Sequence, residues 1–480
     1  MRLPTRFVER VRSHPDDTAL VWRHTEISYA QLHGLACAAQ ARLDEMGLAP
    51  GTPVAVRAVK SPDTIALILA LLADGRPLLL PPVDLAAETL TALLDAAGCR
   101  TVLSPEPGPV GARSALRVTA GPDAVGFMLT TSGSTGVPKV VPLTAGAVDR
   151  FVDWAADRFA IGPHRTVLNY APLNFDLCLL DIWTTLAVGG RVVLVEPEHA
   201  TRASYLHDLL ERHHVHVVQA VPMLYALLLQ HGSTLPEVTH AISTGDALTA
   251  RGLAGLPTLF PNAQLHNLYG CTETNDSFLH EIDPVRDCVP LPIGRPIDGV
   301  HAVLVDPSGE VLTGPGVGEL HVNTPFQTSG YTDAALAAAA FGPHPTGADN
   351  RRYFRSGDLV RRHQDGSMSL EGRADFHVKI RGVRVNTQVV ERTLLELDDV
   401  TGAVVFAVPD PVAGNALHAV IHRRAPESLH SLAVRAHCAE RLPLPAVPTA
   451  IRLTDEPLPT TSTGKPDRAR IKRTYIEGQR

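Results

Sequence analysis

The sequence of 480 residues is too long for one ordinary hydrophobic core, so two or more domains are expected. Hydrophobic residues make up 45% and charged residues 19%, which is typical of a water-soluble globular protein. The formal net charge of −7 argues against a general binder of nucleic acids or of acidic membranes.

In chain order, helical and strand-like patterns alternate over the first part of the sequence. Helices are expected at 63–73, 89–97 and 145–159, and strands at 76–80, 100–103, 125–129, 191–195 and 215–220. This alternation favours α/β layers with mainly parallel strands.

After about residue 285 the pattern changes to a β-rich region that is followed by a compact tail. Strands are expected at 301–305, 318–322, 367–370 and 377–380, and the tail reads as a helix at 389–397, strands at 402–408 and 417–422, and a helix at 429–442. A tail of roughly 100 residues is large enough to fold alone. We therefore predict an α/β fold with a large N-terminal domain, residues 1–374, made of layered α/β subdomains plus a β-rich part. A small, mobile C-terminal α+β domain, residues 375–480, would follow.

The cysteines and the apolar runs indicate the cellular setting. The six cysteines are scattered without a Cys-x-x-Cys pair, so neither a disulfide framework nor a zinc site is indicated. The N-terminus becomes charged before an apolar stretch of signal-peptide length. The longest apolar run, Ile65 to Leu72, is too short to cross a bilayer. A reduced, cytoplasmic protein is expected.

Lysine is rare in this chain: of 43 basic residues only five are lysine. Lysine offers a compact ammonium where arginine offers a rigid fork, so a retained lysine marks a position that needs the ammonium. The five are Lys60, Lys139, Lys379, Lys465 and Lys472. Three of them fall within the motifs below, whereas chance retention at the surface stays open for Lys60 and Lys472.

The strongest local pattern is the segment from Met128 to Lys139, an expected strand that runs into a loop with two glycines, five hydroxyl residues and one lysine. Glycines let backbone N–H groups approach a phosphate closely, hydroxyls add donors, and the lysine adds charge. A helix capped by Thr144 is expected to follow. A phosphate-binding loop is favoured over a flexible polar turn. Its expected binding residues are Thr131, Ser132, Gly133, Ser134, Thr135, Gly136 and Lys139.

This loop and five further segments, in this order, resemble motifs of the adenylate-forming superfamily, which includes acyl-CoA synthetases, firefly luciferase and the adenylation domains of nonribosomal peptide synthetases. The further segments are Asn-Leu-Tyr-Gly-Cys-Thr-Glu-Thr at 267–274, Gly-Glu-Leu at 318–320, Tyr-Phe-Arg-Ser-Gly-Asp-Leu at 353–359, the hinge-like run at 372–382 and the lysine-containing run at 458–468. The resemblance implies two half-reactions. A carboxylate attacks the α-phosphorus of ATP and releases pyrophosphate, and a thiol then attacks the acyl-adenylate and releases AMP.

The resemblance also implies roles on the nucleotide side. Lys465 would be the catalytic cation between the substrate carboxylate and the phosphate. Thr272 would donate to the α-phosphate, and Glu273 would hold Mg²⁺. The remaining residues are Asp358 at the ribose hydroxyls, Asn267 and Tyr269 at the adenine, Arg373 at the nucleotide, Asp375 at the hinge and Lys379 on the face used for thiol transfer. The alternatives are that Tyr269 is an ordinary core residue and that Lys379 is a solvent-exposed lysine on a strand.

The substrate side is implied by the run Pro-Leu-Asn-Phe-Asp-Leu-Cys-Leu-Leu-Asp-Ile-Trp at 172–183, which looks like that of free-standing prolyl-AMP ligases. Asp176 matches the acid that binds the substrate α-amino group. A buried carboxylate without a cation is costly, and an ammonium substrate would supply the cation, unlike a fatty or aryl acid. The other implied pocket residues are Leu177, Leu180, Ala220, Ile242, Thr244, Leu268, Asp276 and Ser277. The apolar members favour a small amino acid, with proline leading, while Asp276 keeps a small polar or diamino acid open.

The expected function is therefore adenylation of a small amino acid with ATP and Mg²⁺ in nonribosomal peptide-type secondary metabolism. The few residues after Arg468 leave no room for a carrier module, so a separate carrier protein with a phosphopantetheine arm is the expected thiol partner. Coenzyme A stays open as acceptor. An acyl- or aryl-CoA ligase is one alternative, against which Asp176 argues. A catalytically inactive binding protein is the other, against which Lys465, Asp358 and Glu273 argue.

Overall fold

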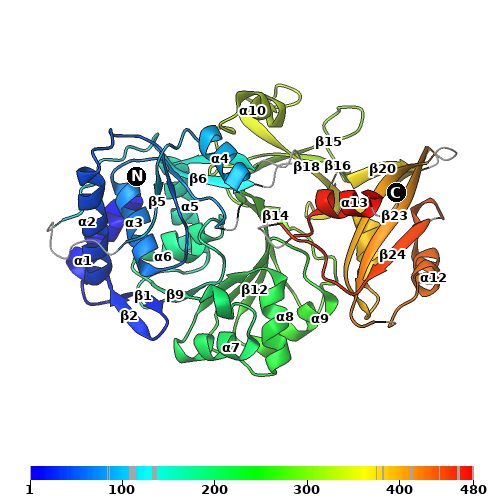
Figure 1. The fold of residues 1–480 in the computed structure, drawn as a ribbon, viewed down its shortest axis with the longest axis horizontal. Helices are drawn as coiled ribbons and strands as arrows, with labels where there is room; N and C mark the ends of the chain where they lie inside the picture. Colours follow the sequence, from blue (N-terminus) through cyan, green and yellow to red (C-terminus); the bar gives the residue numbers. More distant parts are fainter. Residues whose placement is uncertain are drawn as a thin grey trace. The chain divides into compact units, whose positions relative to one another are not determined.

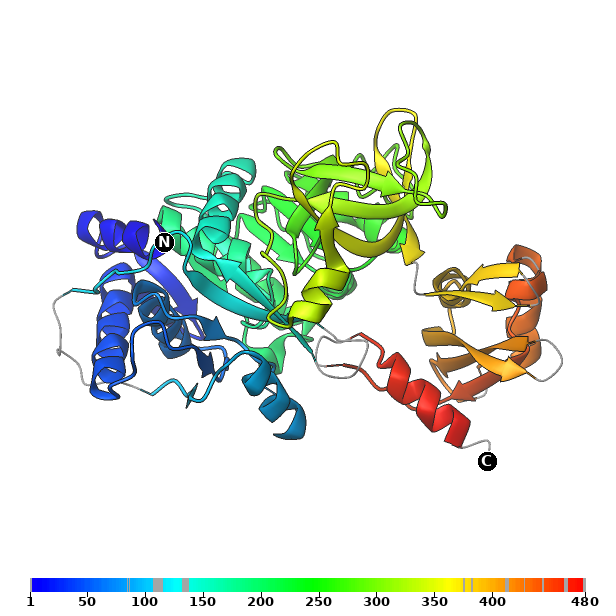
Figure 2. The same cartoon turned by 90° about the horizontal axis from the view of Figure 1, so that it is seen from above.

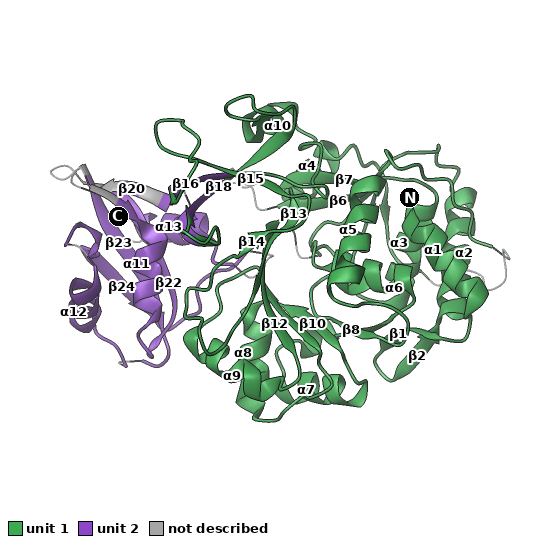
Figure 3. Ribbon diagram, turned by 180° about the vertical axis from the view of Figure 1, so that it is seen from behind, with its two compact units in different colours: residues 1–316, 321–356, 362–369 green, residues 317–320, 357–361, 370–480 purple. Residues whose placement is uncertain are grey.

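The computed structural model describes residues 2–83, 85, 87–106, 115–131, 138–373, 376–380, 383–410, 414–426, 428–442, 444–461 and 465–477. The chain divides into two compact units (Figure 3). Unit 1 comprises 1–316, 321–356 and 362–369, and unit 2 comprises 317–320, 357–361 and 370–480. The expected boundary between 374 and 375 lies outside the described residues and stays a prediction.

The largest sheet of unit 1 has nine strands and a parallel centre (Figure 1). Its strand order is β14-β13-β12-β11-β10-β8-β9-β1-β2. The bounds are β1 (Thr18–Trp22), β2 (Thr25–Ser28), β8 (Thr166–Asn169), β9 (Arg191–Leu194), β10 (Val217–Ala220), β11 (His240–Thr244), β12 (Gln264–Cys271), β13 (Asn275–Glu281) and β14 (Arg295–Pro296). The strands from β1 to β12 in this order pair in parallel, and β2, β13 and β14 add antiparallel edges.

Helices cover this sheet because its central strands are apolar on both faces. The helices α7 (Ala203–Arg212), α8 (Pro222–His231) and α9 (Ala250–Leu259) lie side by side (Figure 1) and bury a core with β10 and β11. The π-helix η1 (Leu179–Thr184) continues into α6 (Thr185–Val188) and packs against α5 (Ala145–Arg158). The carboxyl ends of β8, β10, β11 and β12 therefore meet at one edge of the sheet, where α/β proteins bind ligands.

A second sheet of unit 1 has the order β5-β3-β4-β6-β7. Its strands are β3 (Val54–Val56), β4 (Leu78–Leu79), β5 (Val102–Leu103), β6 (Val125–Thr131) and β7 (Lys139–Thr144), with the helices α1 (Arg2–Ser13), α2 (Tyr29–Glu45), α3 (Pro62–Ala73) and α4 (Ala87–Ala96) in the same part of the chain. The helix α3 begins after Ser61, whose hydroxyl accepts from the Thr64 amide at 3.1 Å. All but one of its residues are buried, as the apolar run predicted.

The expected phosphate loop joins two antiparallel strands rather than a strand and a helix. Thr131 at the end of β6 pairs with Lys139 at the start of β7. The helix α5 begins only after β7, with the Thr144 hydroxyl accepting from the Ala147 amide as predicted. The sequence pattern did not indicate β7 because Pro142 interrupts its apolar run. An edge strand such as β7 tolerates the missing N–H.

The β-rich region forms a third sheet with the order β15-β16-β18-β17, in which β19 also pairs with β18. Its strands are β15 (His301–Val305), β16 (Gly316–Asn323), β17 (Phe341–Pro343), β18 (Arg352–Arg362) and β19 (Met368–Arg373), and α10 (Ala334–Ala340) precedes β17.

Unit 2 ends in a small α+β arrangement (Figure 2). The pair β20 (His377–Ile380) and β21 (Val383–Asn386) is separate from the sheet β22-β23-β24, formed by Val400–Asp410, Gly414–Arg423 and Ala450–Thr454. The helices are α11 (Thr387–Leu395), α12 (Ser431–Arg441) and α13 (Arg468–Glu477). Leu394, Leu417 and Val434 lie in the main core of this unit. The predicted fold class is confirmed, while the mobility of the C-terminal part stays a prediction.

Each expected helix and strand is present with somewhat shifted ends. The sequence patterns did not reveal α1, the β1–β2 hairpin or the antiparallel pair β12–β13. Among the described residues, no helix has the length and apolar character needed to cross a membrane.

Candidate active site

Asp176 and Thr272 meet at the carboxyl edge of the nine-stranded sheet. Asp176 lies in the turn that leads from β8 to η1, and Thr272 lies in the turn between β12 and β13. The Thr272 hydroxyl donates to Asp176 Oδ2 at 2.9 Å. Two motifs quoted separately from the sequence therefore share one contact.

Glu273, next to Thr272, is buried and is held by a residue that no motif indicated. The Tyr331 hydroxyl donates to Glu273 Oε1 at 2.6 Å. The Lys139 ammonium lies 5.0 Å from the centroid of the Tyr331 ring, a cation–π contact. Lys139 and Tyr331 also line a cleft of about 210 Å³. The loop residues Ser132, Gly133, Ser134, Thr135 and Gly136 lie outside the described residues, so their expected phosphate contacts stay a prediction.

Asn267 and Tyr269, the expected adenine residues, are partly buried on β12. The Asn267 amide donates to the Pro292 carbonyl oxygen at 2.7 Å. The ring of Tyr269 meets Phe278 edge to face, with centroids 5.8 Å apart. Both contacts orient side chains on one strand, and the nucleotide role of each stays a prediction.

The expected substrate pocket comes from neighbouring strand ends. Register pairs Ala220 of β10 with Ser243 of β11, and Thr244 of β11 with Leu268 of β12. Leu180, Ala220, Ile242 and Leu268 are buried, which fits an apolar lining. Sheet order therefore brings these residues to one edge, together with the remaining expected members Leu177 in the turn before η1 and Asp276 and Ser277 on β13.

The two expected pocket residues on β13, Ser277 and Asp276, are both polar. The Ser277 hydroxyl is fully buried and bonds locally, donating to the Asn275 carbonyl oxygen at 3.1 Å. Asp276 lies near Asp176, and burial together with the Asp176 charge raises the pKa of the Asp276 carboxyl well above its usual range. Both causes favour the neutral form of the Asp276 carboxyl over its charged form.

Beneath this edge lies a polar cluster of Lys60, Asn169, Cys178 and Asp181 that was not assigned a role from the sequence. All four residues are buried. The sequence could have pointed to Lys60 through the scarcity of lysine, and to Asp181 because it stands in the quoted run 172–183. No sequence feature pointed to Tyr331, because it lies between motifs.

The other expected nucleotide residues belong to unit 2. Arg373 Nη1 donates to Asp358 Oδ1 at 3.0 Å, so these two expected ligands are joined. Lys465 is exposed, and its backbone carbonyl accepts from the Thr461 amide at 2.7 Å. Asp375 lies outside the described residues. The backbone of Lys379 lies in β20, and its side chain is outside the described part.

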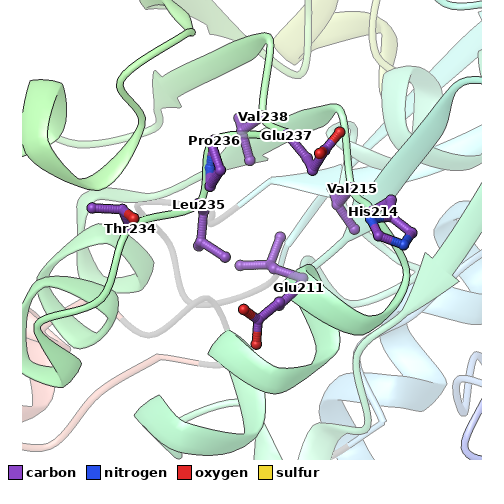
Figure 4. Close-up of a pocket in the computed structure, with 9 residues that line it drawn as sticks. Glu211, His214, Val215, Thr234, Leu235, Pro236, Glu237 and Val238 are labelled. Atoms are coloured by element: carbon purple, nitrogen blue, oxygen red, sulfur yellow. The ribbon is translucent and has the colours of Figure 1, made fainter.

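A further pocket, of about 210 Å³, is lined by none of these residues (Figure 4). It is formed by the end of α7 with Glu211, by His214, and by the segment 234–238 that precedes β11. It contains none of the residues expected from the sequence, so the contacts at the carboxyl edge define the candidate site.

Comparison with known proteins gives matches along most of the chain. The model of the AMP-binding enzymes matches residues 7–120 and 105–332, and that of the AMP-binding enzyme C-terminal domain matches residues 389–465. The L-proline--[L-prolyl-carrier protein] ligase of Pseudomonas fluorescens is 30% identical, with 99% of each chain covered. The ligase of the same name from Streptomyces coelicolor is 32% identical over 95% of this chain and 87% of that protein.

Among solved structures, o-succinylbenzoate coenzyme A synthetase from Bacillus subtilis, in complex with AMP, superposes with a TM-score of 0.86. It is 20% identical and 98% of each chain is covered, so this likeness concerns the fold.

Proposed function

The chain belongs to the AMP-binding family of adenylate-forming, ATP-dependent ligases, and from this premise we propose that it activates a small amino acid and loads it onto a separate carrier protein. The hydrogen bond from Thr272 to Asp176 carries the proposal. It joins a residue of the expected α-phosphate side to the acid expected for the α-amino group. Such proximity is what an attack of the substrate carboxylate on the α-phosphorus requires.

In the first half-reaction, one oxygen of the amino-acid carboxylate forms a bond to the α-phosphorus of ATP while the bond to the pyrophosphate oxygen breaks. The products are aminoacyl-AMP and pyrophosphate. In this step Asp176 would bind the α-ammonium, and Thr272 would turn its one hydroxyl proton from Asp176 to the α-phosphate. Lys465 would supply the cation shared by the carboxylate and the phosphate. These groups lower the repulsion between two anions and fix their geometry.

In the second half-reaction, the thiol of a phosphopantetheine arm attacks the acyl carbonyl carbon and AMP leaves with the bonding electrons. The thiol proton is released. Lys379 on the thiol-transfer face and rotation at Asp375 are parts of this proposal. The names of the two prolyl-carrier ligases support a carrier protein as the acceptor.

Magnesium fits Glu273. Its carboxylate is buried, and one of its oxygens is fixed by Tyr331. A single carboxylate combined with phosphate oxygens and water is a common arrangement for Mg²⁺. When bound with ATP, the ion neutralises charge on the phosphates. The chain's own contribution is to hold Glu273 in a fixed orientation through the Tyr331 hydroxyl.

Proline is the leading substrate within this proposal. The apolar, buried members of the pocket and the two prolyl-carrier ligases support it. A second candidate is a small amino acid with a polar or amino side chain. It is favoured by the position of Asp276 on β13, near Asp176, because a substrate amine beside that carboxyl would stabilise its charged form.

Amino-acid-dependent exchange of pyrophosphate into ATP tests the proposal. The panel contains the common amino acids, proline analogues, diamino acids, and simple acids such as benzoate. Proline-stimulated exchange supports the leading substrate, and exchange with a diamino acid supports the second candidate. Thioester formation is then compared with a prolyl-type carrier protein and with coenzyme A. Turnover of simple acids with coenzyme A, without amino-acid-dependent exchange, would reverse the assignment to a CoA ligase.

A further inference from the structure

Lys60 is a buried cation that reaches from the second sheet to the end of β8. It lies after β3 and directly before Ser61, the cap of α3, and is 5% exposed. Its ammonium donates to the carbonyl oxygens of Asn169 at 3.2 Å and Tyr170 at 3.3 Å. These two residues begin the segment that leads to Asp176. Lys60 is therefore an interior residue, and not a surface lysine retained by chance.

Asn169 continues the network from β8 into η1. Its side-chain amide, fully buried, donates to the Ala171 carbonyl oxygen at 3.2 Å and to Asp181 Oδ2 at 3.3 Å, and contacts Cys178 Sγ at 3.4 Å. One amide thus ties both ends of the turn that carries Asp176. A fully buried polar group used in this way fixes backbone positions on either side of it.

Asp181 makes this network depend on charge. It is fully buried, and its Oδ1 has no hydrogen-bond partner among the described residues. Burial raises the pKa of Asp181 well above its usual range, while Asn169 and Lys60 act in the opposite direction. Burial lowers the pKa of Lys60 to about 8, and the nearby Asp181 carboxyl acts against this shift. Each of the two groups therefore favours the charged form of the other, while burial disfavours both charged forms.

Asp181 is also linked through the backbone to the walls of the substrate pocket. Its amide donates to the Leu177 carbonyl oxygen at 3.2 Å, and the Leu180 amide donates to the same oxygen at 3.1 Å. A shift of Asp181 would therefore move both leucines and the turn that presents Asp176.

We propose that Lys60 is a positioning residue for amino-acid binding: its buried ammonium holds the end of β8 through the carbonyl oxygens of Asn169 and Tyr170, so that the segment 170–178 presents Asp176 to the substrate ammonium. The inference rests on the proposed function and adds to it a residue outside the family motifs quoted above.

The test compares Lys60→Met with a matched control, Arg76→Met. Arg76 is also a buried cation of unit 1. It donates to Asp74 at 2.7 Å and to the carbonyl oxygens of Ala49 at 2.6 Å and Leu48 at 2.9 Å, away from the site residues. Pyrophosphate exchange gives KM for the amino acid and for ATP, and thermal unfolding gives Tm. Both variants are expected to lower Tm. Only Lys60→Met is expected to raise KM for the amino acid, by tenfold or more, with KM for ATP changed less than twofold.

A second variant separates positioning from loss of packing. In Lys60→Met/Asp181→Asn the buried charge is removed on both sides, so Tm is expected to recover in part, whereas KM for the amino acid is expected to stay raised because the carbonyl oxygens of Asn169 and Tyr170 still lack their donor. Asp181→Asn alone leaves Lys60 without its acid and is expected to raise that KM, which keeps the test usable should Lys60→Met not fold. Equal effects on both KM values, or a double variant with a wild-type KM for the amino acid, would overturn the inference. Failure of the wild-type enzyme to exchange pyrophosphate with any amino acid would instead refute the proposed function.

Discussion

The Thr272 hydroxyl donates to Asp176 Oδ2 at 2.9 Å, although the two residues are 96 positions apart in the sequence. The contact lies where two loops leave the same edge of a largely parallel sheet. It connects the half of the site expected to hold phosphate with the half expected to hold an ammonium.

Replacing Asp176 should impair amino-acid use much more than ATP use. A hydrogen bond to a charged group contributes about 1.5–3 kcal/mol, which corresponds to about a 10- to 100-fold rise in KM for the amino acid in Asp176→Asn. Pyrophosphate exchange measures this KM. Thr272→Val retains the carboxylate and is expected to affect KM for the amino acid less. An unchanged affinity of Asp176→Asn for the amino acid would refute the ammonium role.

Tyr331→Phe should weaken the use of magnesium and ATP. The variant keeps the ring that faces Lys139 but removes the hydroxyl that donates to Glu273 at 2.6 Å. A threefold to tenfold rise in KM for ATP is expected, at roughly 1 kcal/mol for a lost hydrogen bond. Exchange rates are titrated with Mg²⁺ at fixed ATP. The control is Tyr353→Phe, whose hydroxyl donates to Asp349 at 2.9 Å, and identical Mg²⁺ curves for the two variants would contradict the prediction.

Lys465→Ala should remove most adenylate formation and leave folding unchanged. Lys465 is exposed, so its loss leaves no buried group without a partner. Loss of one group that stabilises transition-state charge typically lowers kcat by about 10²- to 10³-fold. The measurements are pyrophosphate exchange and the thermal unfolding curve, with Lys472→Ala as a lysine control. Near-wild-type exchange in Lys465→Ala would exclude its catalytic role.

The stability of the enzyme should fall on acidification because of a buried histidine pair. His240 Nδ1 and His266 Nε2 are 3.2 Å apart, and the two rings are stacked. Burial, with the Arg158 charge, lowers the pKa of His266 to about 3 and that of His240 to about 4. Between these values and the ordinary 6.5, the unfolded chain binds more protons than the folded chain. The free energy of unfolding therefore falls as the pH is lowered through this window, by up to about 1.4 kcal/mol per pH unit for each histidine.

Urea unfolding between pH 5 and 8 measures that slope. His266→Leu is expected to flatten it, whatever its effect on stability at pH 8, because one of the two proton-binding differences is removed. His24→Gln, at an exposed position, is expected to leave the slope as in the wild type. Equal slopes for all three proteins would show that the pair is not responsible.

Much of the secondary structure could be predicted from the sequence because it depends on local patterns. The apolar run at 63–73 became α3, and Thr144 caps α5 as expected. The strand β7 was missed because Pro142 made an edge strand look irregular, and the β12–β13 pair was missed because motif residues occupy both strands. Positions such as Glu273 and Asp358 could be proposed from the sequence because each stands in a short contiguous motif.

The sequence by itself determined the family, the order of its motifs and the residue types available for chemistry, since these are properties of contiguous segments. Only the tertiary structure decided that Asp176 accepts a hydrogen bond from Thr272 and that Glu273 accepts one from Tyr331. It also decided that Lys60 is buried in the interior instead of exposed at the surface. These partners come from strand ends and loops far apart in the chain. Sheet order and burial bring them together, and burial makes charge pairing decisive, because an uncompensated charge costs far more in the interior than in water.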